Sequence, residues 1–157
     1  MKVLLINSNT RKLPWPVLPI GLCYIASNAE RAGHDISFLD LTFSKNGRRE
    51  VIAALKREAP DVIGVSVRNI DNNTWRDPIF FPPAIKEMVI DICRQYSAAP
   101  IVIGGGAVGV NPKELLDFFE VDYAIQGDGE AAFIELLDKL PSGQIQQIAG
   151  LVYRVRD

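Results

Sequence analysis

The length and composition of the chain indicate a single domain and disfavour strongly charged partners. At 157 residues, 48% of them hydrophobic, the chain is long enough for one domain with a full core but too short for two. The formal net charge of -2 provides no basic field, which disfavours nucleic acid and anionic membrane surfaces as partners. The apolar runs are strand-sized and no signal-peptide pattern precedes the first strand, so a cytoplasmic location is expected.

Strand-like and helix-like segments alternate along the chain. Short runs of β-branched and other apolar residues predict strands at 2–6, 36–39, 62–67, 101–103 and 121–125. Apolar residues at helical spacing predict helices at 19–32, 50–59, 82–96 and 112–119, and a last helix that opens at 126–130. This alternation predicts an α/β domain over 1–145 with a flavodoxin-like (Rossmann-like) fold, a doubly wound parallel sheet of order 2-1-3-4-5 in three α/β/α layers. Residues 146–157 are predicted to be an edge strand or a linker toward a missing C-terminal domain.

Two isolated cysteines, Cys23 and Cys93, fall inside predicted helices among apolar neighbours. This environment predicts two buried free thiols. Together with the single histidine of the chain, they do not suffice for a structural zinc site or for an iron-sulfur cluster.

Two long loops, at 7–18 and 66–81, follow the first and third predicted strands. In the order 2-1-3-4-5 the winding of the sheet reverses between these two strands, and ligands of such sheets bind there. Loops this long in a compact domain are usually functional or disordered. The third strand also turns abruptly polar at Ser66, Arg68 and Asn69, so we expect a ligand over the two loops.

Three ligands common in this fold can be compared with the loops. A phospho-acceptor site needs acidic residues after the first and third strands, but the chain has Asn7, Ser8 and Ser66 there, which excludes it. A Gly-x-Gly-x-x-Gly dinucleotide motif after the first strand is absent. An FMN phosphate loop needs glycine, which residues 7–10 lack, so FMN is left as the weaker alternative.

Several segments resemble, in the same order, the N-terminal cobalamin-binding domain of cobalamin-dependent radical S-adenosylmethionine (SAM) enzymes. They lie at 18–22, 24–26, 32–34, 61–71, 103–106, 127–130 and 151–154, so that the resemblance extends over nearly the whole chain. It implies that cobalamin (vitamin B12) lies across the carboxyl ends of the strands. It also implies a C-terminal radical SAM domain of the same parent chain, which holds S-adenosylmethionine and a 4Fe-4S cluster and performs methylation or a related conversion.

The resemblance further assigns the cofactor-binding residues. Ser66 would bond the nucleotide tail of cobalamin, and the glycines at 104–106 would leave room for its dimethylbenzimidazole, although an ordinary tight turn is the alternative for these glycines. The backbone of residues 67–69 would face the corrin ring. Trp15 and Trp75 would cover the ring, contact a partner domain or close the local core. The predicted cofactor-binding residues are Asn7, Ser8, Trp15, Ser66, Val67, Arg68, Asn69, Gly104, Gly105, Gly106 and Gly127, with no catalytic or metal-ligating residue.

A histidine ligand for cobalt is missing from the predicted site. Other cobalamin modules carry Asp-x-His-x-x-Gly after the first strand, where this chain has no histidine; many members of the radical SAM family share this absence and bind the cofactor base-off. His34 precedes the second strand, at the opposite rim of the sheet, and is predicted to be a surface loop residue. Arg68 follows the third strand, where this strand would meet the lower face of the corrin, so its side chain would occupy the axial space below cobalt. Because a guanidinium has no available lone pair, it would do so without ligating the metal. The alternative is an ion pair of Arg68 with Asp71 or Asp77 that orders the loop.

Four other polar residues near the loops have ordinary structural interpretations. Asp128 and Glu130 are predicted to cap the last helix. Asn72 and Asn73 are either amide partners of the corrin side chains or turn residues.

The catalytic half of the resembled enzymes lies outside this chain. Their Cys-x-x-x-Cys-x-x-Cys cluster motif follows the cobalamin domain, and two isolated cysteines cannot replace it, so the chain alone is expected to have no radical activity. A domain of the same fold that no longer binds cobalamin and serves as a docking scaffold is the alternative from another class.

Overall fold

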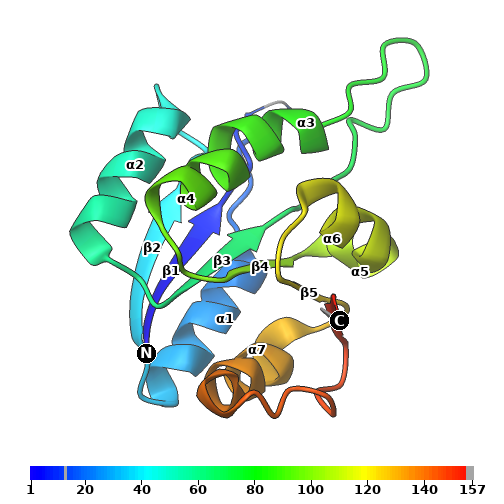
Figure 1. Ribbon diagram of the computed structural model, residues 1–157. Helices are drawn as coiled ribbons and strands as arrows, with labels where there is room; N and C mark the ends of the chain where they lie inside the picture. The colour runs from blue at the N-terminus through cyan, green and yellow to red at the C-terminus, as the bar shows by residue number, and fades with distance from the viewer. Residues whose placement is uncertain (13, 155–157) are drawn as a thin grey trace.

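A six-stranded sheet forms the centre of the structure, a computed structural model that describes residues 1–12 and 14–154 (Figure 1). The strands are β1 (Lys2–Asn7), β2 (Asp35–Asp40), β3 (Val62–Ser66), β4 (Ile101–Gly104), β5 (Tyr123–Ile125) and β6 (Leu151–Tyr153). Their order is β2-β1-β3-β4-β5-β6, and every neighbouring pair is parallel except β5 and β6. The predicted flavodoxin-like order 2-1-3-4-5 is confirmed, with antiparallel β6 added beside β5. The boundary at residue 145 stays a prediction, and residues 155–157 of the last segment lie outside the described residues.

Helices cover both faces of this sheet, as a three-layer fold requires. On one face lie α1 (Ile20–Arg31) and α7 (Gly129–Lys139), and a short 3-10 turn, η2 (Leu140–Ser142), follows α7. On the other face lie α2 (Gly47–Glu58), α3 (Pro82–Ile85), the π-helical turn η1 (Lys86–Ile90), α4 (Asp91–Tyr96), α5 (Gly106–Val110) and α6 (Pro112–Phe119). Among the described residues, no helix has the length and apolar character needed to cross a bilayer.

Alternate side chains of each strand belong to two separate hydrophobic cores, one on each face of the sheet. In β1, Leu4 and Ile6 belong to the core beneath α2 and α4, whereas Val3 and Leu5 belong to the core beneath α1 and α7. In β3, Ile63 and Val65 face the first of these cores. Because successive side chains of a strand point to opposite faces, the remaining positions of β3 face α1 and α7.

Two helices differ from the sequence-based prediction. The helix predicted to begin at 50 begins at Gly47, because the Asn46 side chain accepts a hydrogen bond from the Arg49 backbone N–H at 3.1 Å. The helix α5 was not predicted, since its two glycines lower helix propensity and the glycines at 104–106 were assigned to the nucleotide tail of cobalamin or, as the alternative, to a tight turn. Tertiary contacts on the sheet therefore override a weak local preference in α5.

The end of α2 stores a small amount of backbone strain. Its C-cap is Ala59 in the left-handed conformation, with φ 44°, where a Cβ is unfavourable and glycine is the usual residue. We expect Ala59→Gly to raise the free energy of unfolding by about 0.5–1 kcal/mol in urea denaturation. Ala53→Gly, in the exposed interior of the same helix, is the matched control and should lower it by about 1 kcal/mol. An equal loss of unfolding free energy in both variants would contradict the backbone strain assigned to Ala59.

The prediction of two buried thiols is correct for only one of them. Cys93 is buried, and burial raises the pKa of its thiol to about 12. Cys23 is exposed. The helix α1 turns Leu22 and Ala29 toward the sheet, and the next residue after Leu22 lies about 100° around the helix, on the solvent side.

Thiol alkylation should therefore distinguish the two cysteines. At about pH 8, iodoacetamide is expected to modify Cys23 in the native chain and to spare Cys93, which is both buried and protonated. Mass spectrometry of the intact chain should show one adduct under native conditions and two in denaturant. Because the unfolded chain loses the Cys93 proton first, stability should also fall as pH rises from about 9 to 12. Rapid native labelling of Cys93 would be inconsistent with its burial.

Candidate functional site

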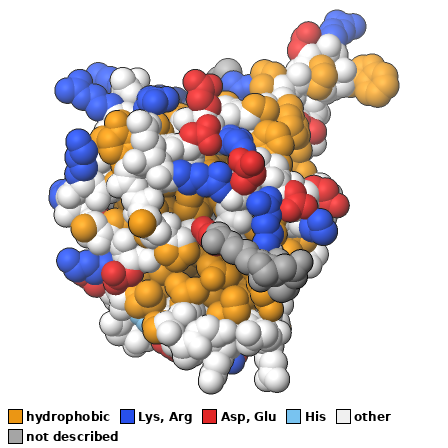
Figure 2. All heavy atoms as spheres, in the orientation of Figure 1, with side chains coloured by type: hydrophobic (Ala, Val, Ile, Leu, Met, Phe, Trp, Pro, Cys, Tyr) orange, Lys and Arg blue, Asp and Glu red, His pale blue; other side chains and the backbone are white. Residues whose placement is uncertain are grey.

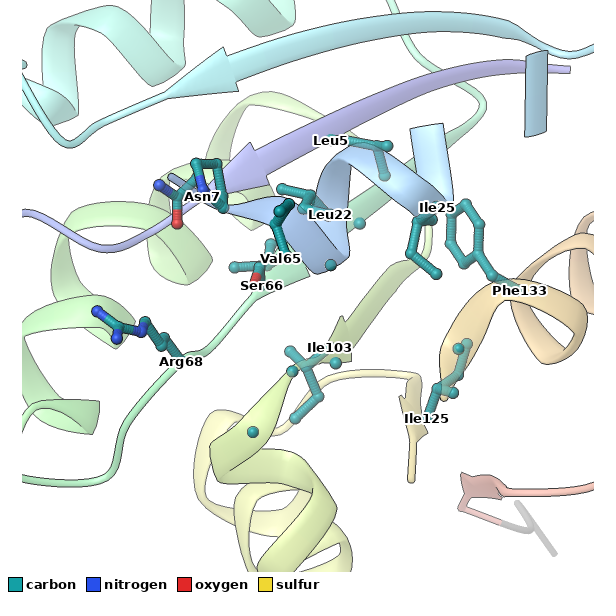
Figure 3. A pocket seen from close by; sticks show the side chains of 18 of the residues that line it. Leu5, Asn7, Leu22, Ile25, Val65, Ser66, Arg68, Ile103, Ile125 and Phe133 are labelled. Carbon is teal, nitrogen blue, oxygen red and sulfur yellow. The ribbon is translucent and has the colours of Figure 1, made fainter. Parts of the chain in front are cut away.

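A cavity of about 370 Å³ opens at the carboxyl ends of the parallel strands and reaches down between the sheet and helices α1 and α7 (Figure 3). It thus lies over the strand ends where the winding reverses, as expected. The lining residues are Leu5, Asn7, Asn9, Val17, Leu18, Pro19, Ile20, Gly21, Leu22, Ile25, Gly64, Val65, Ser66, Arg68, Val102, Ile103, Gly104, Gly105, Gly106, Ile125, Gly127, Asp128, Gly129, Glu130 and Phe133.

Small side chains on two neighbouring strands create this cavity. On the α1 and α7 face, β3 presents Gly64 and Ser66, and β4 presents Gly104 beside Ser66 in the sheet register. A glycine inside a buried strand often marks the close approach of a ligand or another backbone. At Gly64 the side chain of Leu5 already leans over the missing Cβ, which would lie 2.6 Å from Leu5 Cδ2. The hollow therefore lies mainly nearer the strand ends.

The turn after β4 contains three glycines with different roles. At Gly105, φ is +101°, and a Cβ would lie 2.8 Å from the carbonyl oxygen of Val67. At Gly106, a Cβ would lie 3.0 Å from the carbonyl oxygen of Arg68. Around Gly104 no atom of the described residues, apart from its chain neighbours, lies within 4 Å of the Cβ position, so these contacts do not require a glycine here. The tight-turn interpretation thus accounts for two of the glycines, and Gly104 leaves open space.

Polar groups gather at the mouth of the cavity. The Asn7 side chain is engaged within the chain, because its Nδ2 donates to Asp40 Oδ1 at 2.7 Å and to Thr42 Oγ1 at 3.1 Å. Asn9 Nδ2, by contrast, is buried without a hydrogen-bond partner among the described residues. A buried donor without a partner is costly, so the mouth is poised for a ligand that brings an acceptor.

Comparison with known proteins decides the family. The family model described as B12 binding domain matches residues 8–137. The chain belongs to the B12-binding domain family. Among curated proteins, this B12-binding domain is 33% identical over 143 residues to tryptophan 2-C-methyltransferase of Streptomyces laurentii, covering 90% of this chain and 23% of that protein. It is 28% identical over 137 residues to hopanoid C-3 methylase of Methylococcus capsulatus, covering 85% of this chain and 24% of that protein.

Solved structures agree with this assignment. The radical S-adenosylmethionine methyltransferase TsrM from Kitasatospora setae, with cobalamin and a 4Fe-4S cluster bound, superposes with a TM-score of 0.90 at 28% identity, over 98% of this chain and 27% of that chain. The cobalamin-dependent S-adenosylmethionine radical enzyme OxsB, with aqua-cobalamin bound, has a TM-score of 0.73 at 16% identity, over 96% of this chain and 20% of that chain, and shows the fold alone. The B12-binding domain spans about a quarter of the length of the two curated relatives.

Most predicted binding residues line the cavity of the B12-binding domain, but four do not. Those that line it are Asn7, Ser66, Arg68, Gly104, Gly105, Gly106 and Gly127. Ser8 instead donates its hydroxyl to the Ser66 carbonyl oxygen at 2.7 Å and ties β1 to β3. Val67 is fully buried, Trp15 is 78% exposed, and Asn69 is exposed at the surface.

Sequence reasoning missed the apolar wall of the site. Leu5, Ile25, Val102, Ile125 and Phe133 come from five different elements, and each matches an ordinary core residue in its own segment. Gly64 and Asn9 were also not singled out. For this missed part of the site, the lone glycine inside the β-branched third strand is the local signal that could have pointed to it.

Arg68 lies at the cavity mouth and its guanidinium points away from the apolar part (Figure 3). Within the described ranges it forms no ion pair with Asp71 or Asp77, which makes that alternative wrong. The Asp71 carboxylate instead accepts a hydrogen bond from the Asn73 backbone N–H at 2.7 Å. Arg68 is therefore a solvent-exposed cation beside the cavity, free to meet a ligand.

His34 is placed at the opposite rim from the cavity, as predicted, but it is not a surface residue. It directly precedes β2, whereas the cavity opens where the strands end. Its side chain is only 7% exposed, and its Nε2 lies 3.5 Å from Asp138 Oδ1. The prediction of a surface loop residue is wrong because α7 packs over this position. No group of three or more His, Cys, Asp or Glu side chains among residues 1–12 and 14–154 could hold a metal ion.

The acidic pair at the start of α7 lines the cavity mouth. Asp128 occupies the N-cap position, but its side chain makes no capping hydrogen bond, so the predicted cap is wrong in this respect. Glu130 lies in the first turn, where a carboxylate interacts favourably with the helix dipole.

The loop between β3 and α3 projects from the domain (Figure 1). An isolated bridge pairs Asp71 with Phe80, and Asn72 closes the loop by accepting from the Ile79 N–H at 2.9 Å and donating to the Asp77 carbonyl oxygen at 2.9 Å. Asn72 is thus a turn residue. Trp75 is fully exposed, so it does not close the local core, and hydrophobic side chains are visible on the projection in Figure 2.

Proposed function

We propose that this B12-binding domain holds cobalamin base-off, with the nucleotide tail in the cavity and the corrin ring above the strand ends. The single observation that carries the proposal is the cavity itself. It lies at the strand ends beside Ser66 and Gly104, next to α1 and α7, on a chain that belongs to the B12-binding family. At about 370 Å³ it lies at the small end of ligand pockets, which suits one arm of cobalamin better than the whole molecule.

The residues at the mouth fit the polar parts of the cofactor. Asn9 Nδ2, which has no hydrogen-bond partner among residues 1–12 and 14–154, would donate to an oxygen of the tail or of a corrin amide. The Ser66 hydroxyl stands beside the open space at Gly104, where the tail would enter. Asn7 and Ser8 hold the first loop and Ser66 in place through hydrogen bonds within the chain.

The positions of the cavity and of His34 support base-off binding. A dimethylbenzimidazole that occupies the cavity is held away from cobalt, and His34, the single histidine of the chain, is at the other rim. Arg68 would fill the space below the corrin without ligating cobalt, because a guanidinium has no available lone pair. When bound, cobalamin supplies a cobalt centre that accepts and donates a methyl group, and the chain supplies its binding and orientation.

The domain would serve a C-terminal radical SAM domain of the same parent chain, in a methyltransferase-type enzyme. The relatives that it matches are about four times as long, and two of them are a methyltransferase and a methylase. S-adenosylmethionine and the 4Fe-4S cluster would be held by that second domain. Cys23 and Cys93 lie on helices on opposite faces of the sheet and cannot form a cluster site together.

Titration with hydroxocobalamin tests the proposal. We expect saturable binding and, after reduction to cob(II)alamin, an absorption and electron paramagnetic resonance spectrum without nitrogen splitting from an axial imidazole. Nitrogen splitting would contradict base-off, His-off binding. An absence of binding at millimolar cofactor would overturn the function and favour the docking scaffold, and a yellow, FMN-loaded protein would favour the flavodoxin-like alternative.

Arg68→Ala should change the coordination of bound cob(II)alamin, because its removal would admit water to the lower face of the corrin. The expected result is a shift of the cob(II)alamin spectrum toward a five-coordinate species. Arg76→Ala, on the exposed loop, is the matched control and should leave the spectrum unchanged. Identical spectra for both variants would show that Arg68 does not occupy the axial space below cobalt.

A further inference from the structure

The inner part of the cavity is lined by apolar side chains, whereas polar side chains gather at its mouth. The deep wall is made by Leu5, Val102, Ile125 and Phe133, whose exposed fractions are 1%, 3%, 4% and 3%. In Figure 3 the side chains of Leu5, Ile25, Ile125 and Phe133 lie on the side away from Arg68, and no polar side chain is labelled among them. The polar lining residues lie at the ends of β1 and β3 and at the start of α7.

The backbone N–H and C=O groups at this depth are already paired between neighbouring strands. Leu5 is paired with Gly64, Gly64 with Val102, and Ile125 with Leu151 across the sheet. Strand N–H and C=O groups in such ladders bond to their neighbours and are not available to a ligand. The deep part of the cavity thus offers apolar contact and few hydrogen bonds.

We propose that this wall selects corrinoids by their lower base and favours a benzimidazole over a purine. The inference rests on the proposed function, in which the nucleotide tail enters the cavity. A benzimidazole with methyl groups presents an apolar edge, whereas adenine presents an exocyclic amine and ring nitrogens that lose their water. Burying polar groups without partners is costly, and such a loss can discriminate between ligands of similar shape. The phosphate and ribose of the tail would remain at the polar mouth beside Ser66 and Asn9.

A ligand series on the unmodified chain tests the selection. Cobalamin, the unmethylated benzimidazole analogue, the adenine analogue and cobinamide, which lacks the nucleotide, are titrated by absorbance and by calorimetry. We expect the adenine analogue to bind roughly 10- to 100-fold more weakly than cobalamin, and the benzimidazole analogue within about 10-fold of it. Equal affinities for cobalamin and the adenine analogue would overturn the selection and leave the proposed function standing. Equal affinity for cobinamide would overturn tail binding as well, and failure of all four to bind would overturn the function itself.

A substitution in the apolar wall tests whether these side chains cause the preference for cobalamin over the adenine analogue. Val102→Thr keeps the shape of the side chain and adds a hydroxyl to the deep cavity, so it should reduce the preference for cobalamin by roughly fivefold. Val110→Thr, at a 73% exposed position outside the cavity, is the matched control and should leave the preference unchanged. A folded Val102→Thr domain with an unchanged preference would contradict the role of this wall. If Val102→Thr does not fold, the ligand series on the unmodified chain still decides the proposal.

Discussion

Leucine in place of Gly104 is expected to weaken cobalamin binding by at least about 100-fold, with little change in stability. Gly104 ends β4 beside Ser66 and lines the cavity, and in the part of the chain that the structure describes nothing but its chain neighbours lies within 4 Å of the position of its Cβ. A larger side chain would therefore extend into open space that the nucleotide tail is proposed to occupy. Titration with hydroxocobalamin and urea denaturation of the same variant measure the two effects separately.

Gly104→Ala is the matched control for this prediction. A methyl group fills a small part of the space, so its effect on affinity should lie between those of glycine and leucine. A folded Gly104→Leu domain that binds cobalamin as tightly as the unmodified chain would show that the tail does not pass this position. Loss of binding together with unfolding would instead show that position 104 is needed for the fold.

Gly105→Ala is expected to lower the free energy of unfolding by about 2–3 kcal/mol. Gly105 has φ 101° and ψ 178°, a region that is essentially restricted to glycine, and a Cβ there would lie 2.8 Å from the Val67 carbonyl oxygen. That oxygen accepts a hydrogen bond from the Ala107 N–H at 3.1 Å, so a displaced turn would also loosen the start of α5. Urea denaturation measures the loss.

Gly109→Ala provides the comparison within the same short helix. No atom lies within 4 Å of its Cβ position, and its φ is not in the left-handed region. Alanine should therefore stabilise the domain by up to about 1 kcal/mol. Similar stability changes at positions 105 and 109 would refute the assignment of Gly105 to backbone geometry.

The two predictions separate two uses of neighbouring glycines. Gly105 and Gly106 allow the backbone of the turn to approach the chain that leaves β3, whereas Gly104 leaves space for something that the chain does not supply. In the sequence these glycines are equivalent, because the contact that distinguishes them comes from residues almost forty positions earlier.

Local patterns were sufficient to predict the fold. Apolar runs at 2–6, 62–67 and 101–103 and the helical spacing between them led to the order 2-1-3-4-5, which the structure confirms. Where local patterns were weak, the prediction was wrong or incomplete. The helix α5 carries two glycines, and Cys23 was assigned to the core because an apolar neighbourhood in sequence does not state which side of a helix faces the sheet.

The site was predictable in part. Ser66, Arg68 and the glycines after β4 follow strand ends, and strand ends at the winding reversal of a parallel sheet are where ligands bind. The apolar wall was not predictable, because Leu5, Val102 and Phe133 match any core residue until the sheet and α7 bring them to one cavity. Asn9 likewise became notable only when its Nδ2 was found buried without a partner among the described residues.

The sequence by itself therefore determined the family, the order of the strands and the edge of the sheet at which the cavity opens. The order of the strands and this edge follow from periodicity and from residues adjacent along the chain, and the family follows from the resemblance of several segments to known proteins. Only the tertiary structure decided which glycine has open space at its Cβ position, which cysteine is buried, that the single histidine is covered, and how far the apolar wall extends. Each of those depends on contacts between residues distant in sequence, and local spacing carries no information about such contacts.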